Sequence, residues 1–178
     1  SNKEGQFLNI EQCFNMCDIQ GENAGGLIGK ESGKLGEVNI INCYNWGSIN
    51  SSGAGGLIGS YAGIYGKVNS KCCYNNGNIN GENAGGMIGS YASHYGNINI
   101  ENAYNTGNIN ASGAGGLIGA ICGGYKSNVN IKNIYNKGDI LGVNAGGIFG
   151  FNTGFLSSIV IANVYPPGSV SNNGYSII

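Results

Sequence analysis

The sequence predicts an all-β protein, a β-solenoid (parallel β-helix-like) of about six 30-residue coils. Three observations predict it: a motif that recurs at a fixed period, apolar–polar alternation inside each period, and a composition that disfavours helices. A fixed period of about 20 to 50 residues is typical of solenoids and other repeat architectures. Glycine supplies 35 of the 178 residues and asparagine is also abundant, and both oppose helix interiors.

The recurring motif reads Ala-Gly-Gly-(Leu/Met/Ile)-(Ile/Phe)-Gly. Its five copies are Ala24–Gly29, Ala54–Gly59, Ala84–Gly89, Ala114–Gly119 and Ala145–Gly150. An aromatic–Asn pair has the same period from Phe14-Asn15 onward, and Tyr165-Pro166 is its divergent last copy. We therefore expect one elongated domain, residues 1–178, with coils at roughly 6–35, 36–65, 66–95, 96–126, 127–156 and 157–178, the last one partial.

Each copy contains short stretches in which apolar and polar residues alternate, such as Val38-Asn39-Ile40 and Ile98-Asn99-Ile100. This period of two, bounded by Gly and Asn, predicts strands. We expect three or four short strands per coil, paired in parallel register with the next coil at about 4.8 Å. Equivalent positions would then stack into columns along the rod.

Three apolar columns begin at Ile19, Leu27 and Ile28. The columns of Ile19 and Leu27 are expected to face the core. The column of Ile28 should face the opposite way if its segment is a strand, because successive strand residues alternate in direction. The variable stretch that follows is then expected to cover it as a flap, through an apolar column of its own: Leu35, Tyr65, Tyr95, Tyr125 and Phe155.

Two polar columns have structural interpretations. The first, before each Ala-Gly-Gly, consists of Asn23, Gly53, Asn83, Gly113 and Asn144. Asn and Gly accept left-handed backbone most readily, so this column predicts a turn position with positive φ. The second consists of Asn15, Asn45, Asn75, Asn105 and Asn136, and it predicts an internal ladder of amide hydrogen bonds.

Composition excludes several classes of function. Charged residues make up 10% of the chain, the net charge is −1 and no basic patch is present, so nucleic-acid binding is not expected. No apolar stretch approaches 18 residues, so no membrane insertion is expected. The chain starts directly at the repeats without a signal peptide, which suggests a fragment or a processed form.

Six cysteines are present, and Cys13, Cys43 and Cys73 share one column. Ala103 and Ile134 follow in the same column, so we expect these cysteines to pack as small apolar residues. Their spacing does not match a zinc site. No catalytic, metal-binding or cofactor-binding residue is predicted.

The remaining chemical groups support this view. His94 is the only histidine and is expected to be an ordinary surface-loop residue. Carboxylates of one column, such as Glu22 and Glu82, lie two coils apart, whereas polysaccharide hydrolases need a close pair. Exposed aromatic columns are the one feature with binding potential: Tyr61 with Tyr91, and Tyr65 with Tyr95 and Tyr125.

The segment Cys43–Ile49 followed by Ala54–Gly59 resembles the GLUG motif, Tyr-Asn-x-Gly-x-(Ile/Val) followed by Gly-Gly-Leu-(Ile/Val)-Gly. The resemblance covers nearly the whole chain, in five full copies and one partial copy. It implies a secreted or cell-surface bacterial protein, as in repeat regions of immunoglobulin A-cleaving metallopeptidases and large adhesins. The His-Glu-x-x-His of such peptidases is absent, so only a non-catalytic repeat region is matched.

We therefore expect a non-enzymatic structural or adhesive repeat module of a cell-surface protein, which acts as a stalk or a ligand-presenting rod. Its partner would be a host glycan or a host protein. Pro166-Pro167 is expected to cap the last coil, whereas an uncapped N-terminal coil would allow end-to-end self-association. The alternatives are an intracellular or virion structural protein, of the kind found in giant viruses, and a carbohydrate-active enzyme of β-helix type.

Overall fold

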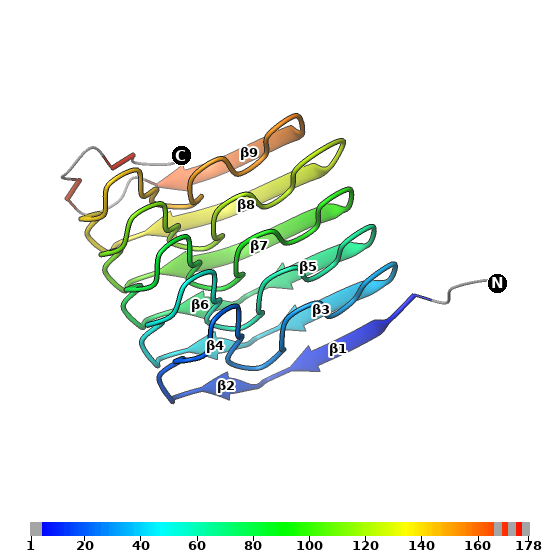
Figure 1. The fold of residues 1–178 in the computed structure, drawn as a ribbon, viewed down its shortest axis with the longest axis horizontal. Coiled ribbons are helices and arrows are strands. Elements are labelled where there is room, and N and C mark those ends of the chain that lie inside the picture. The colour runs from blue at the N-terminus through cyan, green and yellow to red at the C-terminus, as the bar shows by residue number, and fades with distance from the viewer. Residues whose placement is uncertain (1–4, 166–168, 171–173, 176–178) are drawn as a thin grey trace.

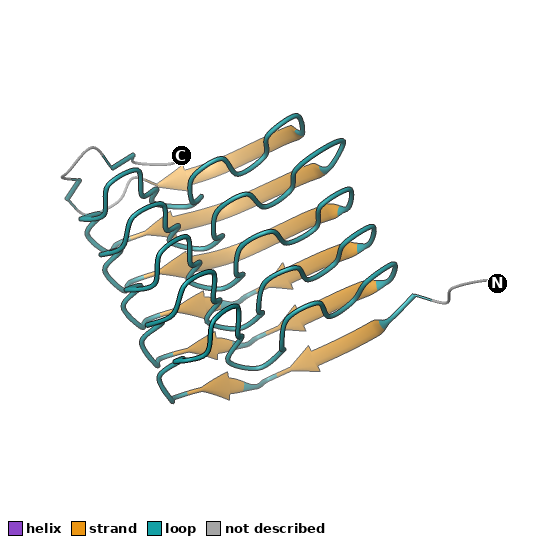
Figure 2. Ribbon diagram, in the orientation of Figure 1, coloured by secondary structure: helices purple, strands orange, loops and turns teal. Residues whose placement is uncertain are grey.

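The computed structural model describes residues 5–165, 169–170 and 174–175. In this part of the chain it contains no helix, and the strands stack in parallel as a β-solenoid of about five turns (Figures 1 and 2). The predicted fold class is confirmed. The predicted proline cap at residues 166–167 lies outside the described residues.

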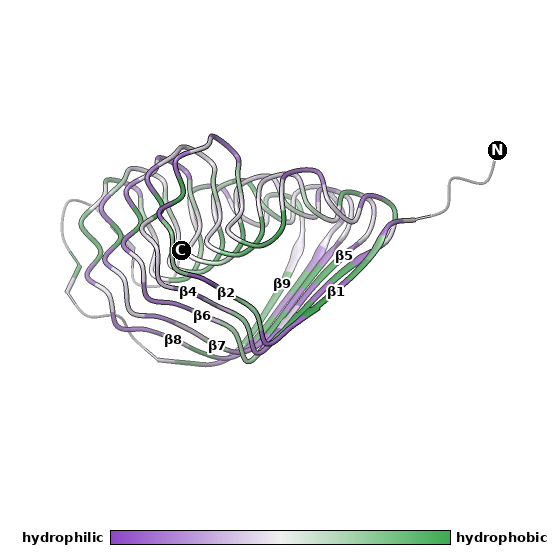
Figure 3. Ribbon diagram, turned by 90° about the horizontal axis from the view of Figure 1, so that it is seen from below, coloured by the Kyte–Doolittle hydropathy of each residue, from purple (hydrophilic) through white to green (hydrophobic). Residues whose placement is uncertain are grey.

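Each turn contributes two strand segments, which stack into two walls that meet at a corner (Figure 3). The first turns use separate strands: β1 (Phe7–Glu11), β2 (Phe14–Asn15), β3 (Glu37–Ile41), β4 (Tyr44–Asn45), β5 (Lys67–Lys71) and β6 (Tyr74–Asn75). Later turns join both segments into one strand: β7 (Asn97–Asn105), β8 (Asn128–Asn136) and β9 (Ser158–Tyr165). All pairs are parallel, and equivalent residues are partners, such as Val38 with Val68.

The corner between the two walls has left-handed backbone. Its six residues have φ between 53° and 56°: Gln12, Asn42, Cys72, Asn102, Asn133 and Asn163. Four of them are Asn, the non-glycine residue that accepts this conformation with little strain. This positive-φ column was not predicted from the sequence. The turn column that was predicted is confirmed, with φ between 54° and 66° from Asn23 to Asn144.

The rest of each coil contains single parallel bridges instead of the further strands that we expected. These bridges join the columns of Ile19, Gly25 and Ile28. The N–H groups of Leu57 and Ile58 both donate to the carbonyl oxygen of Met87, at 3.0 and 2.9 Å. Because this backbone is not a regular strand, side chains do not alternate across it. Leu57 and Ile58 are both fully buried in one core cluster. The condition that this segment is a strand is therefore not met, and the Ile28 column does not face away from the core under a flap.

The variable stretch is a part of the coil wall and not a flap. Tyr61, Gly63 and Tyr65 have φ values of 61°, 64° and 56°, and their N–H groups donate to carbonyls of adjacent turns. Ala62 is buried between them, whereas the apolar column predicted to cover the coil is exposed, with Tyr65 at 55%. The coil needs 30 residues because this stretch closes it.

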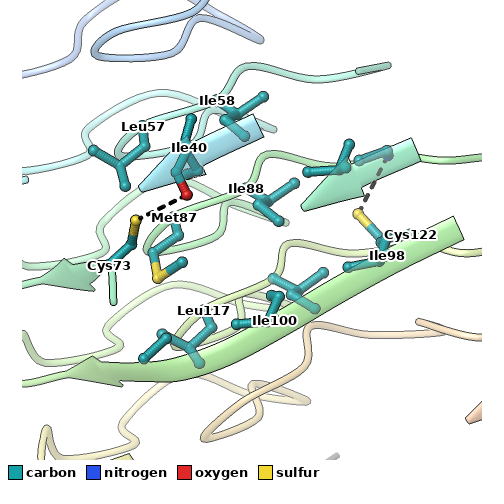
Figure 4. Packing of buried hydrophobic residues seen from close by; sticks show 14 of the residues in the cluster. Ile40, Leu57, Ile58, Cys73, Met87, Ile88, Ile98, Ile100, Leu117 and Cys122 are labelled. Atoms are coloured by element: carbon teal, nitrogen blue, oxygen red, sulfur yellow. Dashed lines mark hydrogen bonds between the residues drawn. The ribbon is translucent and has the colours of Figure 1, made fainter. Parts of the chain in front are cut away.

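Two apolar clusters fill the solenoid. The larger one packs the inward residues of the first wall, such as Val38 and Ile40, against the Leu27 and Ile28 columns (Figure 4). The smaller one consists of the Ile19 column, the alanines of the repeated motif and Ala111. The predicted interior positions are therefore confirmed from Ile19 to Ile140 and along the Leu27 column, whereas Val170, the last residue of the Ile19 column, is 44% exposed.

A buried amide ladder runs along the second wall, as predicted. Each Asn from Asn15 to Asn105 donates from Nδ2 to Oδ1 of the Asn in the next turn, at 2.7 Å. The same Nδ2 also donates to the carbonyl two residues later, for example Asn75 to Gly77 at 2.7 Å. Both N–H bonds of each of these amides are thus used inside the protein.

Replacing Asn75 by Ala should lower the free energy of unfolding by about 3 kcal/mol. It leaves one of the two N–H donors on Nδ2 of Asn45 unpaired, because the other still donates to Gly47, and it removes the donor to Oδ1 of Asn105. An unsatisfied buried group costs about 1–3 kcal/mol. The matched control is Asn80→Ala, which interrupts an exposed ladder of the same chemistry and should cost under about 0.5 kcal/mol. Denaturant midpoints measure both effects, and equal losses would contradict the importance of burial.

The paired glycines of the repeated motif are required because neighbouring turns approach closely. A Cβ on Gly85 would overlap the carbonyl oxygen of Ile88 and the amide nitrogen of Gly119, and both are backbone atoms that cannot swing aside. A Cβ on Gly29 of the first turn would meet nothing within 4 Å. Glycine is therefore required at Gly85, the first glycine of its motif. It is not required at Gly29, the last glycine of the first motif.

We expect Gly85→Ala to destabilise the protein by about 1–3 kcal/mol, the usual cost of overpacking. Gly29→Ala is the control, and it should leave the thermal midpoint unchanged or slightly raised because alanine restricts the unfolded chain. Comparable destabilisation by the two substitutions would show that the close approach of turns is not the cause.

Candidate functional site

Two grooves run along the solenoid axis on the outside of the first wall. In each strand of this wall alternate residues point outward, so that Glu37, Asn39 and Ile41 are half-buried while Val38 and Ile40 are buried. Stacking converts each outward position into a row of side chains. The grooves lie beside these rows, and both continue across several turns.

The first groove, here called the aromatic groove, has a volume of about 310 Å³. Its floor is the glycine row Gly36, Gly66 and Gly96, and its lining residues are Phe7, Leu35, Glu37, Tyr65, Lys67, Tyr95 and Asn97. Because glycine has no side chain, the floor stays open between the row of Leu35, Tyr65 and Tyr95 and the row of Glu37, Lys67 and Asn97. The structure thus places Tyr65 and Tyr95, two of the predicted binding residues, in a concave surface.

The tyrosines of this column stack on one another. Ring centroids are 5.1 Å apart for Tyr65 and Tyr95, with planes at 8°, and 5.7 Å apart for Tyr95 and Tyr125, at 19°. Phe155 ends the column with an edge contact to Tyr125, at 84°. Since the ring faces cover each other, the column presents ring edges and hydroxyl groups to a ligand.

The other predicted pair forms a separate column. Tyr61 and Tyr91 stack at 5.0 Å with planes at 4°, and both are half-buried. They do not line either groove, and no ring contact within the described residues joins them to the Tyr65 column. The five predicted tyrosines therefore make up two surfaces and not one.

His94 lies in a surface turn, as expected, but its ring is packed against the aromatic column. It contacts the edges of Tyr95 and Tyr125 at centroid distances of 5.3 and 5.1 Å. The ring occupies the space beside Gly124, where a Cβ would come within 2.7 Å of it. Its buried Nδ1 has no hydrogen-bond partner among the described residues.

The longest aromatic stack is a surface feature that was not predicted from the sequence. Phe14, Tyr44, Tyr74, Tyr104 and Tyr135 stack at 4.6–5.1 Å with planes within 6°. Burial and then the neighbouring phenols raise the pKa of Tyr74 and Tyr104. The signal was available, because these residues are the aromatic half of the recurring aromatic–Asn pair.

The second groove, here called the amide groove, has a volume of about 580 Å³ and lies between two other rows of the first wall. One row is an exposed or half-buried asparagine ladder: Asn9, Asn39, Asn69, Asn99 and Asn130. The other row is mixed: Ile41, Lys71, Glu101, Lys132 and Ala162. The apolar–polar alternation of the strands predicts that these residues point outward. It does not predict that a groove lies between them.

Neither groove contains a cluster suited to metal binding. The described residues include no group of three or more His, Cys, Asp or Glu side chains that could hold a metal ion. They also include no helix long and apolar enough to cross a membrane.

Comparisons with known proteins identify no relative: no family model matches the sequence, and neither do any curated proteins or solved structures. The GLUG resemblance therefore stays a prediction.

The cysteines are all unpaired, and three of them are fully buried. Cys43 and Cys73 pack in the larger cluster, where Sγ of Cys73 donates to the carbonyl of Ile40 at 3.6 Å, and Cys122 packs there as well (Figure 4). Burial raises the pKa of Cys73 to about 11 and that of Cys122 to about 12. The expected packing of Cys43 and Cys73 as small apolar residues is confirmed.

Native protein treated with iodoacetamide at pH 8 should be alkylated at the exposed Cys17, and Cys43, Cys73 and Cys122 should react only after unfolding. The raised pKa values add a pH dependence. Above the ordinary thiol pKa of 9.0 the unfolded chain loses these protons while the folded chain keeps them, so stability should fall as pH rises toward 11. Peptide mass spectrometry with and without urea tests the labelling, and rapid labelling of Cys122 in folded protein would contradict it.

Proposed function

We propose that this chain is a non-enzymatic structural and adhesive module of a cell-surface protein, a rod that presents periodic side-chain rows to a ligand. The observation that carries the proposal is the register of these rows. Equivalent residues lie above one another from β1 to β9, so each outward position becomes a continuous row, and the asparagine row repeats one chemistry from β1 to β8. A repeating face suits a polymeric or multivalent partner.

Several features support a load-bearing, ligand-presenting role. The buried amide ladder and the stacked aromatic rows connect consecutive turns, in addition to the backbone hydrogen bonds between them. The aromatic groove with Tyr65 and Tyr95 supplies a partner surface, and a host glycan or host protein is the partner that we propose. The GLUG resemblance supports an extracellular location.

End-to-end self-association is the second partner that we propose. Strand β1 pairs with β3 on one side and with no described strand on the other. Phe7 and Phe14 beside this edge are 72% and 53% exposed. An unpaired parallel edge is a ready template for another chain.

One observation favours a different location for the same rod. All six cysteines are unpaired, whereas exported proteins usually oxidise their cysteines to disulfides. An intracellular or virion structural protein is therefore the second candidate. It predicts the same rigid rod but no contact with the cell exterior.

Protease shaving of intact source cells, followed by peptide mass spectrometry, separates the two candidates. We expect peptides from exposed positions of these repeats, such as those ending at Lys67 or Lys137, to be released without lysis. Peptides of an abundant cytoplasmic protein serve as the control for leakage. Recovery of the repeats only after lysis would reject the surface role and favour the second candidate.

A further inference from the structure

The amide groove crosses the strands of the first wall and follows the axis of the rod. It extends from Asn9 of β1 to Ala162 of β9. Its floor is the sheet itself, where backbone N–H and C=O groups pair between strands. The floor therefore offers mainly apolar surface, and the polar contacts must come from the two side-chain rows.

The asparagine row has hydrogen-bonding capacity left over at each turn. Within the row, Asn39 donates to Asn9 at 2.8 Å, Asn99 to Asn69 at 2.7 Å and Asn130 to Asn99 at 3.0 Å. A primary amide has two N–H donors and two acceptor lone pairs. Asn39 and Asn99 each use one N–H donor and one acceptor lone pair within the row, so each keeps one donor and one acceptor for a ligand. Asn69 differs, because it also donates to Glu37.

The facing row carries little net charge. Glu101 lies 4.0 Å from Nζ of Lys71 and 3.9 Å from Nζ of Lys132, so both lysines share one carboxylate and the three groups leave a net charge of only +1. Ile41 and Ala162 complete the row with apolar side chains. A polyanion would find two lysines that are already paired with a carboxylate, which does not favour it over a neutral chain.

We propose that the amide groove binds a neutral, extended polysaccharide chain that lies parallel to the rod axis. A sugar hydroxyl is both donor and acceptor, which matches the leftover donor and acceptor of Asn39 and Asn99. The axial C–H groups of the pyranose rings cover the apolar floor. Sugar units of an extended β-linked chain advance by nearly the turn spacing of about 4.8 Å, whereas an extended peptide advances by about 3.3 Å per residue and would lose register.

This proposal deepens the ligand-presenting role proposed above and rests on it. The two can nevertheless fail separately. Shaving reports where the parent protein lies, whereas the groove is tested on the purified chain. If the repeats are released by shaving but the purified chain does not bind neutral glucans, only the assignment of the groove is rejected.

The test is native electrophoresis in gels that contain hydroxyethylcellulose, with titration calorimetry against cellohexaose. We expect retardation of the wild-type chain and tighter binding of cellohexaose than of cellotriose, because a longer chain reaches more turns. The double variant Asn39→Leu/Asn99→Leu should bind at least about tenfold more weakly, the effect of losing one or two hydrogen bonds. The matched control Asn80→Leu interrupts an exposed ladder outside the groove and should bind like wild type.

A measurement on the wild type keeps the test valid if the double variant does not fold. Titration with cellohexaose should shift the side-chain amide NMR signals of Asn39 and Asn99, and not those of Asn50, Asn80 and Asn110. No shift and no retardation would overturn the proposal. Binding of dextran sulfate instead, abolished by salt and by Lys71→Ala/Lys132→Ala, would overturn it in favour of an anionic polymer.

Discussion

The hydrogen bonds between consecutive turns are the interaction on which the whole structure depends. Every strand of one turn pairs in parallel with its counterpart in the next, and single bridges extend this pairing to the Ile19, Gly25 and Ile28 columns. A single coil could not bury its own apolar residues. Stacking supplies both the partners for the backbone and the layers of the core, as in other solenoids.

Close stacking limits which residues can occupy each column. Glycine is required where a Cβ would overlap backbone, as at Gly85, and Asn and Gly fill the positive-φ turn before each Ala-Gly-Gly, as at Asn83 and Gly113. Buried amides are tolerated in the Asn75 column because the ladder itself satisfies them. The residues of the repeated motifs are therefore those that stacking requires. Columns whose residues vary between turns are free to serve a function.

The same constraint shapes the outer surface. Stacked rings, as in the Tyr65 column, cover each other's faces, so the column exposes ring edges and hydroxyl groups. Asparagine rows behave differently, because amides linked along a row keep hydrogen-bonding capacity toward solvent. Both kinds of row continue across several turns, and this continuity is the basis for proposing a polymeric partner.

The sequence by itself determined the solenoid, its 30-residue period, the interior Ile19 and Leu27 columns, the positive-φ turn and the buried amide ladder. These features follow from the repeat, because a residue type that recurs at one position must satisfy the same neighbours in every turn. Only the tertiary structure decided the direction of the Ile28 column, since adjacent N–H groups of Leu57 and Ile58 share one carbonyl and break the alternation. It also decided the course of the variable stretch and the two grooves, which depend on how rows from separate turns lie side by side. Period and alternation carry no information about that geometry.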